Sequence, residues 1–431
     1  MSMRDNDTDH GGSRRFIYAF FALLLMALTA TALFNYRVNP YGYFYGWPLV
    51  IDRGNSDWMF SNMRYFKAYD VARYAPEHLV LGSSRAGNGI THVESFVGGL
   101  RSYNIALPGM TPYEMLRYLQ HSHALHPLKG ALLGLDMFTF NRHDQRYRPG
   151  YSEERLLTSA DGTSGEGHLL RARLRDLTIA LLSEDALRST MKTARASEPV
   201  KAGGMRLNDD GSWGKALVDV DSGKAYTRFI KEEDHYVGNG WVGNRSRAFG
   251  LYGHDSRLQY YRELLRFAHQ QRIDLRMFTS PVHARMLVLM KEVGLWGCFE
   301  QWKREMWRIN HEVALEMGRT PFPLWDFAGV DEWTSVQLSK QETPSEYTDS
   351  SHYSLDMGNR VLERIYRNGE FKFGGLIDGG ETLNRRLDLV RNGLRDYIRD
   401  TPEQSAELHA RTAKFWNSEK GYPEIGSCRL D

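Results

Sequence analysis

Short apolar runs alternate with longer stretches of helical period through most of this chain. The first three runs are stopped by glycine, proline, serine or an acidic residue, which is typical of buried parallel strands. The runs are His78–Ser84, Ser102–Ala106, Lys129–Leu135, Leu275–Thr279 and Leu324–Phe327. The helical stretches are Pro112–Ala124, Arg257–Gln271, Phe299–Met317, one that starts near Ser354, and Glu381–Ile398. This alternation predicts an α/β fold with a mainly parallel sheet covered by helices on both faces.

In such a sheet, sites form at the carboxyl ends of the strands. The loops expected there are 82–85, 108–110, 136–138, 280–283 and 348–352. The first four directly follow predicted strands, and the fifth precedes a helix. Chemistry is therefore sought in these loops.

The pattern also divides the chain. Residues 35–75 read as a connector, 76–140 and 251–370 as the α/β domain, and 371–431 as a helical extension without assigned chemistry. Between them, residues 141–250 are polar and rich in glycine and serine, with Arg171–Leu187 the only convincing helix. We interpret 141–250 as an insertion or lid.

An uncharged apolar segment, Phe16–Phe34, precedes all of this. As a helix it would be roughly 28 Å long, which is close to the hydrocarbon thickness of a bilayer. Arg14 and Arg15 favour a cytoplasmic tail at residues 1–15 and export of the chain beyond residue 34, although Arg37 and Arg53 reduce this asymmetry. The alternative is a cleaved signal peptide, because Ala30-Thr31-Ala32 resembles a cleavage site. We favour the uncleaved anchor; both interpretations export the domain.

The composition limits the kinds of molecule that this chain is expected to bind. The 55 Lys and Arg nearly balance the 53 Asp and Glu, so the chain lacks the basic field that nucleic-acid binding requires. The two cysteines, Cys298 and Cys428, fit no metal spacing, and we expect no metal or cofactor. They are either bonded, as an oxidising compartment permits, or two thiols.

Two short motifs carry the candidate chemistry. Gly82-Ser83-Ser84-Arg85 leaves the first strand through a glycine turn, which exposes a hydroxyl at the sheet edge or simply caps a helix. Asp349-Ser350-Ser351-His352 places a carboxylate and an imidazole side by side, so that the carboxylate orients the imidazole and supports its protonated form. An N-capping aspartate with a surface histidine is the alternative.

Together, and in this order, the motifs resemble the SGNH/GDSL hydrolase superfamily. More closely, LVLGSSR, YNIALPGMTPYEM, SPVHA and DSSHYS resemble membrane-anchored SGNH-like proteins of bacterial exopolysaccharide gene clusters. These are relatives of alginate acetylation proteins and, more distantly, of the teichoic-acid D-alanylation protein. The resemblance covers roughly residues 38 to 370, apart from the middle insertion, and implies a three-layer SGNH-like domain.

The resemblance also implies roles. Ser84 matches the nucleophile, His352 the base, Asp349 its orienting carboxylate and Gly109 an oxyanion donor, with the N–H of Ser84 as the second donor. Arg85, Asp136 and His283 are the substrate-binding candidates, and Arg85 and His283 have a structural role as the alternative.

Two positions depart from the family pattern. Ser83 replaces an aspartate, and Asp136 replaces an asparagine that would donate to the oxyanion. A carboxylate there repels a developing oxyanion unless it is protonated or turned aside. The site would then depend on two backbone donors, or recruit Asn141 or Asn88.

The resemblance implies acetyl transfer to an exopolysaccharide outside a bacterial inner membrane, with a membrane-bound O-acyltransferase as acyl donor. An esterase using the same triad is the second hypothesis. A non-catalytic component of a polysaccharide export complex is the third, and Asp136 favours it.

Overall fold

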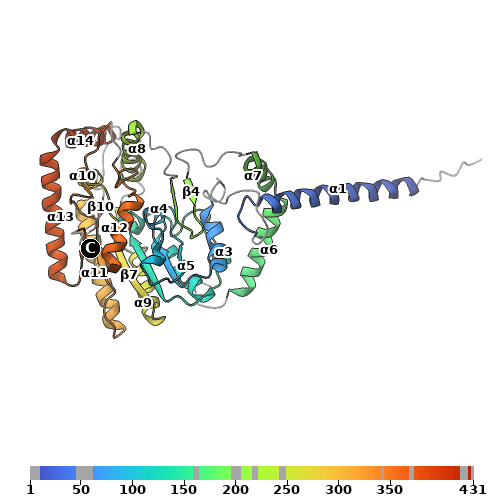
Figure 1. Cartoon of the computed structure of the whole chain (residues 1–431), viewed down its shortest axis with the longest axis horizontal. Coiled ribbons are helices and arrows are strands. Elements are labelled where there is room, and N and C mark those ends of the chain that lie inside the picture. The colour runs from blue at the N-terminus through green and yellow to red at the C-terminus, as the bar shows by residue number, and fades with distance from the viewer. Residues whose placement is uncertain are drawn as a thin grey trace, which may run out of the picture.

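The structure is a computed structural model that describes residues 10–44, 62–158, 165–195, 205–215, 222–241, 249–340, 344–367, 373–417 and 426–428. It is an α/β body from which one long helix projects (Figure 1). This confirms the predicted α/β fold class.

The projecting helix is α1 (His10–Val38), and it contains the whole predicted apolar segment. Its residues Gly12–Val38 form a helix long and apolar enough to cross a membrane. Large apolar side chains between Phe16 and Leu28 are exposed, and the helix that carries them extends away from the body of the molecule (Figure 1). Exposed apolar surface of this size requires an apolar partner.

The central sheet has the order β2-β1-β3-β7-β8-β9. Its strands are β2 (Ser102–Asn104), β1 (His78–Leu81), β3 (Gly130–Leu135), β7 (Asp274–Thr279), β8 (Leu324–Asp326) and β9 (Gly375–Leu376). The first five are mutually parallel, and β9 is antiparallel at the edge. Every residue of β1 and β3 is buried, which explains why these strands read as continuous apolar runs.

Helices surround this sheet (Figure 1). They are α3 (Met63–Tyr74), α4 (Ser84–Gly89), α5 (Pro112–Leu125), α9 (Leu258–Gln270), α10 (Ala284–Glu292), α11 (Trp296–Glu316) and α12 (Leu355–Arg367), with a short 3-10 turn η2 (Val93–Ser95). Two of them correct the sequence analysis. Residues 63–71 of α3 are all buried, so this part of the supposed connector belongs to the core. Helix α10 was missed because its first seven residues are buried on all sides and show no amphipathic period.

The insertion is more ordered than its composition suggested. It holds α6 (Glu166–Leu182), α7 (Glu184–Arg195), α8 (Ser222–His235), the π-helical η5 (Tyr236–Trp241), the hairpin β4 (Met205–Leu207) and β5 (Trp213–Lys215), and short turns η3 (Met137–Phe140) and η4 (Glu153–Arg155) lead into it. The single helix predicted at Arg171–Leu187 is wrong. It is two helices, because the Ser183 side chain accepts the Ala186 N–H at 3.0 Å and starts α7.

The C-terminal extension contributes more than the predicted helices. Besides α13 (Gly380–Asp400) and α14 (Pro402–Asn417), it supplies the edge strand β9 and the short β10 (Gly426–Ser427), which pairs with β6 (Phe249–Gly250). A disulfide joins Cys298 on α11 to Cys428. The sequence left open whether the two cysteines are bonded or are two thiols, and in the structure they are bonded.

Candidate active site

Ser84 is positioned by a glycine turn. Strand β1 ends at Leu81, and Gly82 has φ +150°, where a side chain would be strained. A Cβ at Gly82 would lie 2.7 Å from the Cβ of Ala86, so only glycine allows α4 to start this close to the strand. Ser83 caps α4 by accepting the N–H of Arg85 at 3.2 Å. Ser84 is therefore the first residue of α4, at the carboxyl edge of the sheet.

The structure brings the three triad residues together. The Ser84 hydroxyl and His352 Nε2 are 2.8 Å apart, although 268 residues separate them in the sequence. His352 Nδ1 lies 2.9 Å from Asp349 Oδ1 and 3.0 Å from Oδ2. With Nδ1 donating to the carboxylate, Nε2 is left to accept the serine proton.

The Asp349 loop is held by its own backbone. Asp349 Oδ1 accepts the N–H of Ser351 at 2.9 Å and that of His352 at 2.8 Å. The loop itself is closed by a hydrogen bond from the N–H of Thr348 to the carbonyl of His352 at 2.9 Å. These bonds fix the carboxylate beneath the imidazole.

Electrostatics poise the pair for proton transfer. Burial alone would lower the pKa of His352, but the charge and hydrogen bond of Asp349 raise it above the ordinary histidine value. Burial would raise the pKa of Asp349, whereas His352 and the two backbone donors lower it. The site thus stabilises an imidazolium beside a carboxylate, which is the state formed when His352 accepts a proton.

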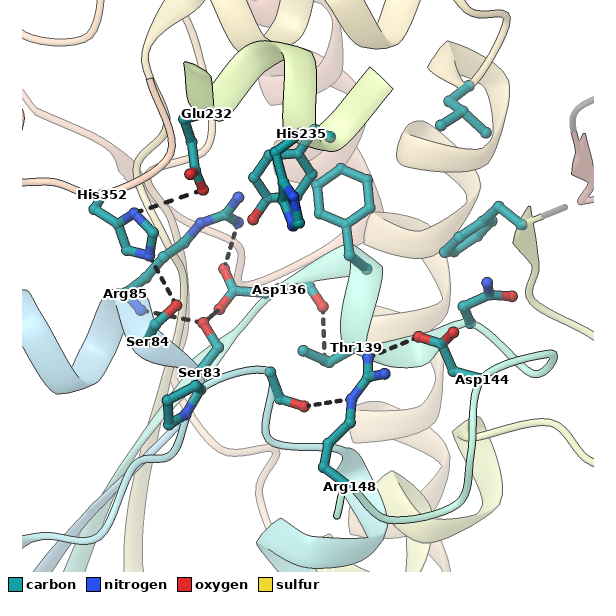
Figure 2. Close-up of a pocket in the computed structure, with 17 residues that line it drawn as sticks. Ser83, Ser84, Arg85, Asp136, Thr139, Asp144, Arg148, Glu232, His235 and His352 are labelled. Atoms are coloured by element: carbon teal, nitrogen blue, oxygen red, sulfur yellow. Dashed lines mark hydrogen bonds and ion pairs between the residues drawn. The ribbon is translucent and has the colours of Figure 1, made fainter. Parts of the chain in front are cut away.

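A second carboxylate, missed in the sequence, faces the same histidine. Glu232 on α8 has Oε1 3.9 Å from His352 Nδ1 (Figure 2). Burial, followed by the charge of Asp349, raises the pKa of Glu232. Its neighbour Glu233 turns inward instead, so α8 presents one carboxylate to the site and one to the core.

Asp136 is neutralised by its neighbours. Its Oδ1 accepts Arg85 Nη1 at 2.7 Å, and its Oδ2 accepts the hydroxyl of Ser83 (Figure 2). Arg85 in turn donates to the Ser351 carbonyl at 3.0 Å and to its hydroxyl at 3.0 Å. The ion pair removes the repulsion that a bare carboxylate would impose on an oxyanion.

This network also explains the role of the serine at position 83. The Ser83 hydroxyl donates to the Asp136 carboxylate at the edge of the sheet. Arg85 ties that carboxylate to the loop that carries His352, so it positions two halves of the site.

The oxyanion donors predicted from the resemblance both border one cavity. Ser84 opens α4, where first-turn amides have no partner within the helix. Gly109 has φ +57°, and its carbonyl accepts Arg148 Nε at 3.3 Å. Asp144 pairs with Arg148 at 2.7 Å and steadies it (Figure 2).

That cavity has a volume of about 510 Å³. The expected lining residues Ser84, Arg85, Gly109, Asp136 and His352 are all on its wall. The remainder of the wall comes largely from the insertion and its entry, of which the sequence analysis had named only Asn141 and the loop 136–138: Phe138, Thr139, Asn141, Asp144, Arg148, Glu232, His235, Tyr236 and Phe249.

His283 is not a substrate-binding residue in this structure, which corrects the prediction. It is fully buried, its Nε2 lies 2.8 Å from the Val336 carbonyl, and its Nδ1 accepts the N–H of Arg285 at 3.3 Å as the cap of α10. Burial lowers its pKa to about 3, so it is neutral. Of the two predicted alternatives for His283, the structural one holds.

The two asparagines that the sequence offered as additional oxyanion donors differ in their position. Asn141 lies on the cavity wall, where its side-chain oxygen accepts the N–H of Gly250 at 3.0 Å. Asn88 lies near the end of α4, outside the cavity wall. Asn141 is therefore the one asparagine of the two that a bound group can reach.

Among the described residues, one group offers donor atoms close enough for a metal ion: Glu232, Asp349 and His352, within 4.8 Å of one another. These side chains are also the ones that surround the imidazole of His352 in the triad. The short hydrogen bond from His352 to Asp349 accounts for their approach.

Fold and site together define a Ser84–His352–Asp349 triad at the edge of a mostly parallel α/β sheet. Comparison of the sequence with protein-family models and with curated proteins finds no match.

Proposed function

We propose that this chain is an SGNH-type O-acyltransferase that moves an acetyl group onto a hydroxyl of a bacterial exopolysaccharide through an acyl-Ser84 intermediate. One observation carries the proposal: a continuous chain of hydrogen bonds from Ser84 through His352 to Asp349, at 2.8 and 2.9 Å. A structural serine has no need of an imidazole oriented by a carboxylate.

The reaction has two balanced halves. Ser84 Oγ attacks the acyl carbonyl of the donor while His352 Nε2 takes the serine proton, and that proton leaves with the donor's leaving group. A sugar hydroxyl then attacks the acyl-serine and gives its proton to His352, and Ser84 recovers it as the ester bond to the enzyme breaks. In both halves the N–H groups of Ser84 and Gly109 stabilise the oxyanion.

The acceptor is a polymer in this proposal. A cavity of about 510 Å³ accommodates a small number of sugar units, with Arg148 and His235 at hand for hydroxyl or acidic groups. Tyr236 and Phe138 add aromatic faces suited to sugar rings.

The setting is the outer side of a bacterial inner membrane, with α1 as the single-pass anchor and the domain in the periplasm. The apolar α1 and the disulfide between Cys298 and Cys428 support it, since disulfides persist in oxidising compartments. The acyl donor is a membrane-bound O-acyltransferase, because activated acyl groups are made inside the cell. The layered SGNH arrangement is part of the same proposal.

The test is Ser84→Ala in the full-length chain. We expect acetylation of the polymer to fall by at least about 10³-fold while the amount of polymer is unchanged. A fluorophosphonate should label the native protein and the Ser95→Ala control, whose serine is exposed and remote, but not Ser84→Ala. Unchanged acetyl content would overturn the proposal and leave the export-scaffold hypothesis.

The esterase alternative uses the same groups and differs only in the acceptor. An activated acetate ester offered to the purified protein separates the two. A transferase releases product in proportion to added oligosaccharide, whereas an esterase turns over equally well without it.

A further inference from the structure

The end of α1 is embedded in the insertion. Asn35 is fully buried: its amide donates to the Leu181 carbonyl at 2.8 Å, and its oxygen accepts the Thr190 hydroxyl at 2.7 Å. Asn35 follows the apolar segment immediately, and Thr31 and Ala32 inside that segment are partly covered as well. Helix α1 packs against both α6 and α7. If α1 crosses a bilayer, these two helices lie at the depth where the hydrocarbon ends.

Helix α6 has two apolar faces. Leu169, Ala172, Asp176 and Ala180 form the buried face, and Asp176 anchors it by accepting the Tyr69 hydroxyl at 2.6 Å and Arg155 at 2.8 Å. A second face, about 120° around the helix, carries Leu170, Leu174, Leu177 and Leu181, spaced four, three and four residues apart. Leu177 and Leu181 on this face are half-buried. Leu170 and Leu174 are 59% and 55% exposed.

Arginines border this leucine stripe. Arg171 and Arg175 lie on one flank and Arg173 on the other, by their positions on the helix. Arg175 pairs with Glu154 at 2.6 Å, and Arg173 lies over the Tyr69 ring at 6.0 Å, so both are directed toward the domain side of the stripe. Leucines at the centre and arginines along the edges are the arrangement of helices that rest in the membrane interface.

The position of α6 agrees with this pattern. It runs across the direction of α1, at the end of the domain from which α1 leaves (Figure 1). Its buried face packs on the domain, and Leu170 and Leu174 on the second face are exposed at this end of the molecule.

We propose that α6 is an interfacial helix that rests on the lipid bilayer, with Leu170, Leu174, Leu177 and Leu181 in the boundary between headgroups and acyl chains. The occupant of this face is lipid because the same helix is joined to the end of an apolar segment long enough to span the membrane. Anchor and α6 together give the domain two contacts with the membrane, which fix its height and orientation. This inference does not depend on the chemistry of Ser84.

Fluorescence quenching by lipid tests it in the full-length chain, with the native disulfide kept. Leu174→Cys is labelled with an environment-sensitive dye and reconstituted in phosphatidylcholine–phosphatidylglycerol vesicles that contain brominated lipid. The matched control is Leu389→Cys on α13, a leucine with the same 55% exposure at the other end of the molecule (Figure 1). We expect quenching at position 174 to exceed that at position 389 by at least about threefold.

A second probe guards against a local effect of the first substitution. Leu170→Cys lies one turn earlier on the same stripe and should report the same quenching. Equal quenching at positions 170, 174 and 389 would overturn the proposal. In that case the stripe contacts a protein partner, which vesicles containing this chain alone do not supply.

Discussion

Two carboxylates surround the Nδ1 side of His352, and they act differently. Asp349 lies at hydrogen-bond distance, 2.9 Å, and orients the ring. Glu232 lies at 3.9 Å, too far to orient it, and acts through charge alone. Because it adds negative charge near the imidazole, Glu232 helps to raise the pKa of His352.

Glu232→Gln should therefore shift the acid limb of the pH profile. General-base catalysis needs neutral His352, so activity falls as pH drops through the pKa of His352. Removing the Glu232 charge lowers that pKa, and the acid limb moves to lower pH, with a change of less than about tenfold at the optimum. The measurement is acyl transfer against pH for the native chain and the variant. Glu154→Gln, an exposed glutamate on the far side of the insertion, is the control. An acid limb that stays in place would show that Glu232 exerts no charge on His352.

The residues of the triad were predictable because each belongs to a short motif. Ser84 follows a glycine turn after an apolar run, and Asp349 and His352 are three residues apart. Glu232 has no such neighbours, since it lies in a run of four acidic and basic residues typical of a solvated surface. The one signal was the four-residue spacing of Ala225, Phe229 and Val237, which places Glu233 on the same face of a helix and Glu232 beside it.

At the level of elements, the distance between Ser84 and His352 depends on two glycines, Gly89 and Gly358, where two helices cross. Helix α12 starts just after His352 and packs against α4, which carries Ser84. A Cβ at Gly358 would lie 1.6 Å from the carbonyl oxygen of Gly89, so the two backbones meet directly. No residue larger than glycine fits at this crossing without moving a helix.

Gly358→Ala should push α12 away from α4 and separate Ser84 from His352. We expect a loss of stability of about 1–3 kcal/mol and loss of fluorophosphonate labelling at Ser84. The control is Gly297→Ala in α11, where an added Cβ meets nothing within 4 Å and improves helix propensity. Thermal unfolding and labelling are measured for both. Full labelling of the Gly358 variant would show that this crossing does not set the catalytic distance.

The sheet strands with continuous apolar runs and the helices α5, α9 and α11 were predicted, whereas α8 was missed although its apolar positions follow a helical period. The five parallel strands were found because burial on both faces leaves continuous apolar runs. Helix α10 and strand β9 were missed: the first is buried all round, and the second has two residues. The break between α6 and α7 depends on the single cap at Ser183, which the helical period of both neighbours obscured.

For the molecule as a whole, buried neutral histidines determine its response to acid. Burial lowers the pKa of His78 and His283 to about 3 and that of His121 to about 4. Each has a hydrogen-bonding partner as a neutral ring; for example, His121 lies 2.9 Å from the Ala68 carbonyl and accepts the Leu157 N–H at 2.9 Å. None of the three lies on the cavity wall.

The free energy of unfolding should therefore fall as pH drops below about 6.5. In the unfolded chain these histidines bind protons near pH 6.5, whereas in the folded chain they do so only near pH 3 to 4. The unfolded state thus binds more protons between these values, and each histidine costs about 2 kcal/mol of stability at pH 5. His352, whose pKa is raised, acts in the opposite sense and offsets part of this loss.

Chemical denaturation in detergent at pH 7.5 and 5.0 measures the effect. His121→Gln, which retains a donor toward the Ala68 carbonyl, should reduce the difference by about a third. Equal free energies of unfolding at the two pH values would contradict the assignment of three neutral histidines.

The sequence predicts contacts between elements only where the elements are close together in the chain. The C-terminal extension was assigned no chemistry, yet Arg411 on α14 and Arg285 on α10 both pair with the buried Glu233, at 2.6 and 2.7 Å. These contacts join segments up to 178 residues apart. No local pattern of the sequence indicates such a pairing.

The same pairing decides how α8 covers the site. Glu233 is held by Arg285 and Arg411, while its neighbour Glu232 lies beside His352. Removing one partner from a buried ion pair costs about 3–5 kcal/mol, so this pairing fixes α8 to the core. Helix α8 is thus a built-in part of the cavity wall. Under the proposed function, an acceptor enters a cavity whose wall is already formed, which suits a polymer that is modified one site at a time.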